Sequence, residues 1–178
     1  MSYKLYLLPA LLLTACTAAD PAAEFQSKLS TLCGNTYTGQ VVSEDPQDED
    51  WRKEDLTLGP VRCEGARIEM PLAVGADTSR TWVLEPKGEG LHFYHIHAHS
   101  DGTEDAVSRY GGMAVIKSGV RATFPADEFT KELFVRENIP VSVPNVWSFD
   151  VNPGVQLAYE LNRPGRHFRA EFDLTKAD

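Results

Sequence analysis

Residues 155–174 read VQLAYELNRPGRHFRAEFDL and indicate the fold more clearly than any other stretch of the chain. Both halves of this stretch place apolar residues at every second position, and side chains of a strand alternate between its two faces. The Pro and Gly in RPGR at 163–166 are typical of a tight turn. The stretch therefore predicts a β-hairpin with one buried and one solvated face. The expected buried residues are Val155, Leu157, Tyr159, Leu161, Phe168, Ala170, Phe172 and Leu174.

The same alternation recurs, in shorter form, over most of the chain, with clusters of Gly, Pro, Asp or Asn between the segments. About ten short strands with no helical pattern between them predict a mostly β, antiparallel domain, either a barrel or a sandwich. Because most connections are short, a lipocalin-like meandering barrel is favoured. Besides the hairpin, the expected strands are 37–43, 66–74, 81–84, 91–99, 114–117, 120–124, 133–136 and 146–151.

One short helix is expected ahead of the first strand. Asp20 suits the N-cap and Pro21 the first helical position, and Gly34 suits the end. Apolar residues with helical spacing lie between them: Phe25, Leu29 and Leu32.

Composition and charge limit the classes of function. The chain has 178 residues, of which 42% are hydrophobic and 24% charged, as in a folded protein of one domain. It contains 17 Lys and Arg residues and 26 Asp and Glu residues, which give a net charge of −9. Affinity for nucleic acid depends on Lys and Arg that neutralise phosphates, so no nucleic-acid partner is expected.

The N-terminal sequence, MSYKLYLLPALLLTAC, predicts where the protein is sent. Lys4 precedes an apolar run that is shorter than the ~20 residues needed to span a bilayer, as in an export signal. Residues 13–16 (LTAC) resemble the lipobox of bacterial lipoproteins. The resemblance implies that the signal is cleaved before Cys16 and that Cys16 carries palmitate or related acyl chains. The alternative is an ordinary cleaved signal that happens to contain a cysteine.

Thr17 follows the cysteine, whereas lipoproteins kept in the inner membrane typically carry Asp there. The resemblance therefore favours an outer-membrane lipoprotein facing the periplasm, with the lipid as its contact with the membrane. The expected organisation is a signal peptide at 1–15, a lipidated tether at 16–23 and a single β domain at 24–178.

The other two cysteines suit an oxidising compartment. With Cys16 modified, Cys33 and Cys63 remain as an even number, and a disulfide between them is expected. Two buried free thiols are the alternative. A zinc site is less favoured, because neither cysteine has a second Cys or His at ligand spacing.

Residues 91–102, LHFYHIHAHSDG, hold the candidate site. His95, His97 and His99 share one face of the expected strand, and Asp101 comes next if the strand continues. The pattern leaves open whether this face lies inside the barrel. Arg109 and Tyr110, in a loop that can overhang the strand, are further candidates for ligand contact.

These histidines have three interpretations. They can line a pocket for a polar or anionic ligand, or they can hold a divalent transition metal such as zinc. Because His95 and His99 would lie about 13 Å apart along a strand, a metal would take one adjacent histidine pair plus ligands such as Asp101. The third interpretation is a hydrogen-bonded polar face. No catalytic residue is assigned, since the sequence contains no Gly-x-Ser-x-Gly elbow and no phosphate-binding glycine loop.

A cation and a large aromatic residue share one face of another expected strand. Arg80 and Trp82 lie two residues apart, which favours stacking of the guanidinium on the indole at a barrel end.

Several motifs together resemble a family of uncharacterised exported proteobacterial proteins. They are LCGN at 32–35, DTSRTW at 77–82, the His-x-His-x-His-x-Asp-Gly run at 95–102, RYGG at 109–112 and FRAEFDL at 168–174. The resemblance implies one exported domain that covers nearly the whole mature chain, and it attaches no role to the histidines.

The sequence thus favours a non-catalytic envelope module that binds a small ligand or an envelope protein through its histidine-rich strand. The alternatives are a metal-binding protein or metal-dependent enzyme, and a purely structural envelope lipoprotein.

Overall fold

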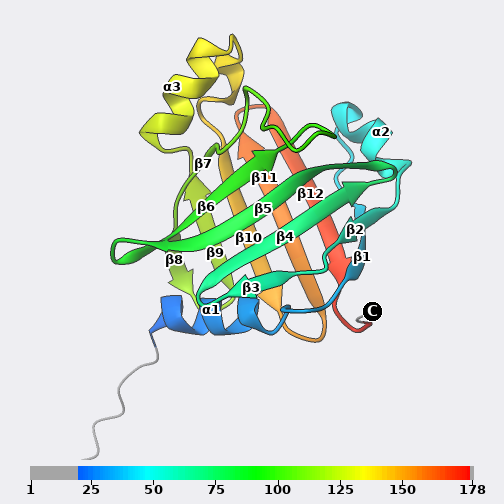
Figure 1. Cartoon of the computed structure of the whole chain (residues 1–178), viewed down its shortest axis with the longest axis vertical. Helices are drawn as coiled ribbons and strands as arrows, with labels where there is room; N and C mark the ends of the chain where they lie inside the picture. Colours follow the sequence, from blue (N-terminus) through cyan, green and yellow to red (C-terminus); the bar gives the residue numbers. More distant parts are fainter. Residues whose placement is uncertain (1–19, 177–178) are drawn as a thin grey trace, which may run out of the picture.

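The computed structural model describes residues 20–176, which form a nearly closed antiparallel β-barrel (Figure 1). The strands are β1 (Tyr37–Val41), β2 (Leu56–Leu58), β3 (Arg62–Glu64), β4 (Arg67–Val74), β5 (Asp77–Lys87), β6 (Gly90–His97), β7 (Gly111–Met113), β8 (Val115–Ser118), β9 (Arg121–Pro125), β10 (Val146–Asn152), β11 (Gln156–Arg163) and β12 (Arg166–Asp173). Their order in the sheet is β7-β6-β5-β4-β2-β1-β12-β11-β10-β9-β8, and β3 pairs with β4 beside this path. Most strands that follow one another in sequence are thus neighbours, so the predicted meander is confirmed.

The ring closes at the junction of β7 and β8, which only Ala114 separates. β7 pairs with β6, and β8 pairs with β9 on the other side. A Cβ on Gly111 would lie 1.8 Å from the carbonyl oxygen of Phe93, and a Cβ on Gly112 would lie 1.8 Å from that of Pro125. The two glycines therefore allow the backbones on both sides to approach closely enough to close the barrel.

The predicted C-terminal hairpin is confirmed. β11 and β12 pair from Gln156↔Asp173 to Arg163↔Arg166 around a two-residue turn. Leu157 and Phe172 are completely buried in the core. Two residues depart from the prediction. Val155, expected to be buried, is 62% exposed because it lies in the turn before β11, and Leu161 is only partly buried.

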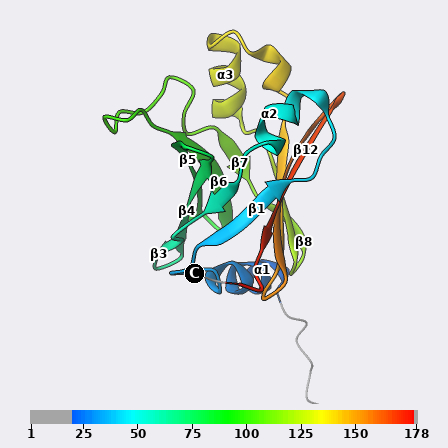
Figure 2. The ribbon, with the colours of Figure 1, turned by 90° about the vertical axis from the view of Figure 1, so that its right-hand side faces the viewer.

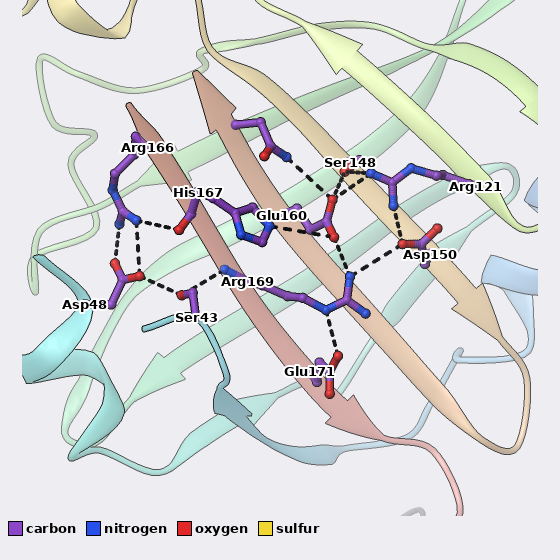
Figure 3. A network of polar contacts seen from close by, with 11 residues as sticks. Ser43, Asp48, Arg121, Ser148, Asp150, Glu160, Arg166, His167, Arg169 and Glu171 are labelled. Carbon is purple, nitrogen blue, oxygen red and sulfur yellow. Dashed lines mark hydrogen bonds and ion pairs between the residues drawn. The ribbon is translucent and has the colours of Figure 1, made fainter. Parts of the chain in front are cut away.

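The outer face of this hairpin is less solvated than predicted, because an ionic network covers it (Figure 3). The Glu160 carboxylate accepts hydrogen bonds from Arg121 at 2.6 Å and Ser148 at 3.0 Å, and it also pairs with Arg169. Arg121 in turn pairs with Asp150. The arginine stems shield the carboxylate from water, so Glu160 is only 8% exposed.

Helix α1 (Pro21–Ser30) covers one end of the barrel, and α2 (Glu49–Arg52) and α3 (Glu128–Arg136) lie at the opposite end (Figures 1 and 2). As predicted, the Asp20 side chain caps α1 by accepting a hydrogen bond from the Ala22 amide at 3.0 Å. Phe25, Leu29 and Leu32 are buried in the core. Residues 21–23 of the expected tether thus belong to α1, and the end that α1 covers is called the closed end below.

The predicted disulfide is confirmed. Cys33 and Cys63 are bonded at 2.01 Å, which ties the segment after α1 to β3. Cys16 and the expected signal peptide lie outside the described residues, so lipidation stays a prediction. None of the helices within residues 20–176 is long and apolar enough to cross a bilayer.

The predicted strand at 133–136 is wrong, because these residues form the end of α3. Asp127 begins the helix by accepting a hydrogen bond from the Thr130 amide at 2.9 Å. Thr130, Leu133 and Phe134 are buried at helical spacing against the barrel, which stabilises a helix over an alternating strand. Residues 44–55, which are rich in Asp and Glu, contain α2 and the 3-10 helix η1 (Pro46–Asp48). A second 3-10 helix, η2 (Pro140–Ser142), follows α3.

Candidate functional site

A cavity of about 380 Å³ lies at the end of the barrel that carries α2 and α3. Its walls come from strands on both sides of the barrel, and α2 and α3 border its mouth. Most of the large side chains in the wall are aromatic. They are Trp51, Trp82, Tyr110, Phe134, Trp147, Tyr159 and Phe168. The cavity therefore offers a mainly apolar surface inside the open end.

Stacked aromatic rings from opposite sides of the barrel meet at the cavity. The Trp82 indole, from β5, stacks on the Tyr159 ring, from β11, with 4.2 Å between centroids and 18° between planes. Phe149 and Phe172 meet the same indole edge-on, at 5.5 and 6.0 Å. Because Trp82 is packed by these rings, it does not stack on Arg80, and that prediction is wrong. Arg80 instead lies 5.0 Å from the ring centre of Trp51.

The structure answers which face of the histidine strand lies inside. His95 and His97 of β6 line the cavity, whereas His92 on the other face contacts Asp127 outside the barrel. β6 ends at His97, so the face does not continue as a strand. His99 lies in the following loop, where its side chain is 58% exposed, and its Nε2 is 4.0 Å from an oxygen of Asp105.

His95 is fully engaged by hydrogen bonds. Its Nδ1 lies 3.1 Å from the backbone carbonyl oxygen of Tyr110, and a carbonyl only accepts, so Nδ1 carries the proton. Nε2 then accepts from the Tyr159 hydroxyl at 2.8 Å. Burial lowers the pKa of His95 to about 3, because desolvation penalises the charged ring. His95 is therefore a neutral group that holds Tyr159 in place.

Tyr110 contacts both inward histidines. Its ring stacks on His95 with 4.4 Å between centroids, and its hydroxyl lies 3.0 Å from Nε2 of His97. Burial lowers the pKa of His97 and raises the pKa values of Tyr110 and Tyr159. The two imidazoles and two phenols thus give the cavity wall hydrogen-bonding groups without charge at neutral pH.

The other predicted site residues lie away from the cavity. Arg109 pairs with Glu104, with 2.9 Å between Nε and Oε2, and its guanidinium lies 6.0 Å from the ring centre of Tyr94 on the outer face. Asp101 is exposed in the loop after β6, where it accepts hydrogen bonds from Thr103. The structure therefore brings together His95, His97 and Tyr110 and separates them from Arg109, Asp101 and His99.

The predicted metal site finds no support in this arrangement. Within residues 20–176, no three His, Cys, Asp or Glu side chains are grouped so that they could hold a metal ion. Both ring nitrogens of His95 already have partners, and Asp101 does not reach the inward histidines. The proposed zinc ligands thus do not form one site in this geometry.

Three arginines line the cavity, and sequence reasoning assigned none of them to ligand binding. Arg166 hydrogen-bonds to the buried carboxylate of Asp48 at 3.1 Å, and Arg80 pairs with Asp77. Arg163 has only neutral partners among the described residues. The sequence pattern does indicate that Arg163 faces the cavity, because it continues the inward alternation of β11 beyond Leu161.

These features define a class: a small up-and-down β-barrel with one end covered by a helix and an aromatic cavity at the other. Comparison with protein-family models, with curated proteins and with solved structures finds no match for this chain. The resemblance noted from the sequence accordingly stays a prediction, and the class rests on the geometry.

Proposed function

We propose that this protein is an outer-membrane-anchored periplasmic lipoprotein that binds a small, partly apolar molecule in the open end of its barrel and catalyses no reaction. The observation that carries the proposal is the aromatic cavity of about 380 Å³. Pockets of roughly 300–1,000 Å³, with apolar walls and a few polar groups, are typical sites for small molecules.

The state of the histidines favours binding over acid–base chemistry. An efficient general base has a pKa near the working pH, whereas burial lowers the pKa of His95 to about 3. Both nitrogens of His95 are also occupied by Tyr110 and Tyr159. We interpret His95 as a residue that shapes the wall, and His97 and Tyr110 as groups that can hydrogen-bond to a ligand.

The position of α1 fits the proposed lipid anchor. Asp20, the first described residue, caps the helix that covers the closed end (Figure 1). A lipid on Cys16 would therefore attach the barrel by its closed end and leave the cavity accessible from the periplasm.

Titration with N-phenyl-1-naphthylamine, a neutral dye that fluoresces in apolar sites, tests the binding proposal. The protein is the mature chain from residue 16, carrying Cys16→Ser and an intact disulfide. We expect saturable binding of one equivalent. Val107→Phe places a larger side chain in the cavity wall and should weaken binding about tenfold or more.

The matched control is Val120→Phe, because Val120 lies in the turn between β8 and β9, away from the cavity, and is 38% exposed. This variant should bind the dye like the parent protein. Absence of saturable binding, or equal weakening in both variants, would overturn the proposal.

A further inference from the structure

The charges around the cavity point to a particular class of ligand. We infer that the cavity selects a small organic monoanion, such as a carboxylate with an apolar body, and that Arg163 binds its anionic group. This inference rests on the proposed binding function and specifies its ligand.

Three arginines line the cavity, although the chain as a whole carries a net charge of −9. The charged residues that line it are Arg80, Arg163 and Arg166 against Asp48 alone. Arg166 pairs with both Asp48 and Asp45, and Arg80 pairs with Asp77 beside the cavity. In the part of the chain that the structure describes, no carboxylate pairs with Arg163, so its charge is the one that a ligand can neutralise.

The hydrogen bonds that hold Arg163 in place do not neutralise its positive charge. Its Nη1 donates to the Ser142 hydroxyl at 3.2 Å and to the Asn145 side-chain oxygen at 3.3 Å. Both acceptors are neutral, and Asn145 is only 5% exposed, so the guanidinium is positioned by a buried group. Its Nε and Nη2 donate to no atom of residues 20–176. A guanidinium with free donors in a fixed fork matches the two oxygens of a carboxylate.

The rest of the cavity suits the apolar part of such an anion. Tyr159 and Leu161 precede Arg163 on the inward face of β11, so an apolar wall leads from the guanidinium toward Trp82. His95 and Tyr159 are uncharged there, so they neither repel an anion nor compete for it. Since one unpaired guanidinium is available, a single negative charge is the best match.

A pair of dyes separates charge from apolar contact. 1-Anilinonaphthalene-8-sulfonate has the same ring system as N-phenyl-1-naphthylamine and adds one negative charge. Arg163→Gln should weaken binding of the sulfonate dye at least about tenfold, equivalent to about 1.4 kcal/mol, and change binding of the neutral dye less than about twofold. Arg163→Lys keeps the charge but loses the fork, so it should restore part of the affinity.

Arg136→Gln is the matched control, because it removes the same charge from α3 at the same end of the barrel, where the Arg136 side chain is 60% exposed and outside the cavity. It should leave both affinities unchanged. Equal weakening of the two dyes by Arg163→Gln, or no weakening of either, would overturn the inference while leaving the proposed function intact. Failure of the parent protein to bind the neutral dye would instead count against the proposed function.

A second measurement uses the unsubstituted cavity and so does not depend on the folding of a variant. Decanoate and decanol share a ten-carbon chain and differ in charge. Decanoate should displace the neutral dye at a concentration at least about tenfold lower than decanol. Equal displacement by the acid and the alcohol would overturn the selection of anions.

Discussion

Replacing Glu160 by Gln should destabilise the protein strongly at neutral pH and much less in acid. Burial by itself would raise the pKa of Glu160, but the hydrogen bonds from Arg121 and Arg169 outweigh it, with help from Ser148, and lower that pKa to about 2 (Figure 3). The ordinary value is 4.5. The folded state therefore favours the charged carboxylate, and at pH 7 this preference is worth about 3 kcal/mol of stability.

The sign of the pH dependence follows from the direction of this shift. As pH falls through 4.5, the unfolded chain takes up a proton on Glu160 before the folded protein does, so the stabilisation declines until pH falls below about 2. At pH 3 about 2 kcal/mol of it should be lost. The amide introduced by Glu160→Gln cannot titrate, so the difference in stability between the parent protein and this variant should shrink by more than half between pH 7 and pH 3.

Urea unfolding followed by tryptophan fluorescence measures both free energies. We expect Glu160→Gln to cost about 2–3 kcal/mol at pH 7, because Asp150 and Glu171 still pair with the two arginines. Glu89→Gln is the control, since Glu89 is exposed in the turn between β5 and β6. A cost below about 1 kcal/mol at pH 7, or one that stays constant down to pH 3, would refute the reasoning.

Other predictions concern the disulfide, the inward histidine and the anchor. Cys63→Ser should lower the free energy of unfolding by about 3–4 kcal/mol, because the bridge closes a loop with a sequence separation of 30 residues; an unchanged melting temperature would contradict this. NMR should show no titration of the His95 ring between pH 8 and about pH 4.5, since burial lowers its pKa to about 3; a midpoint above about pH 5 would argue against the buried neutral ring. Cys16→Ser should abolish incorporation of labelled palmitate in cells, and labelling that persists would exclude Cys16 as the lipidated residue.

Much of the fold could be predicted because the barrel has a solvated outside and an apolar inside. That difference imposes an alternation of period two, which is clearest in the hairpin of β11 and β12. The alternation predicts strands less well where they are short, and β2 and β7 have three residues each. In α3, the run Leu133-Phe134-Val135 is apolar throughout, so its pattern does not distinguish a strand from a helix. The cap at Asp127 and burial against the barrel decide between them.

The candidate site was predicted only where it followed strand geometry. His95 and His97 lie on one face because β6 is regular there. His99 and Asp101 do not join them, because the chain turns after β6. The His99 amide donates a hydrogen bond to the Thr103 carbonyl in this turn. The sequence alone predicts only a turn at Arg163, because Ser142 and Asn145, which accept hydrogen bonds from its guanidinium, lie elsewhere in the sequence.

The junction of β7 and β8 also affects the shape of the cavity. Tyr110, which lies against His95 and His97, is followed directly by Gly111, where the barrel closes. The hydroxyl of Thr130 on α3 receives a hydrogen bond from the Gly111 amide at 2.8 Å and donates one to the Gly111 carbonyl at 2.9 Å. Separation of the strands at this junction would therefore move both a wall of the cavity and the helix at its mouth. The shape of the cavity therefore depends on the close backbone contacts that Gly111 and Gly112 allow where the two ends of the sheet meet.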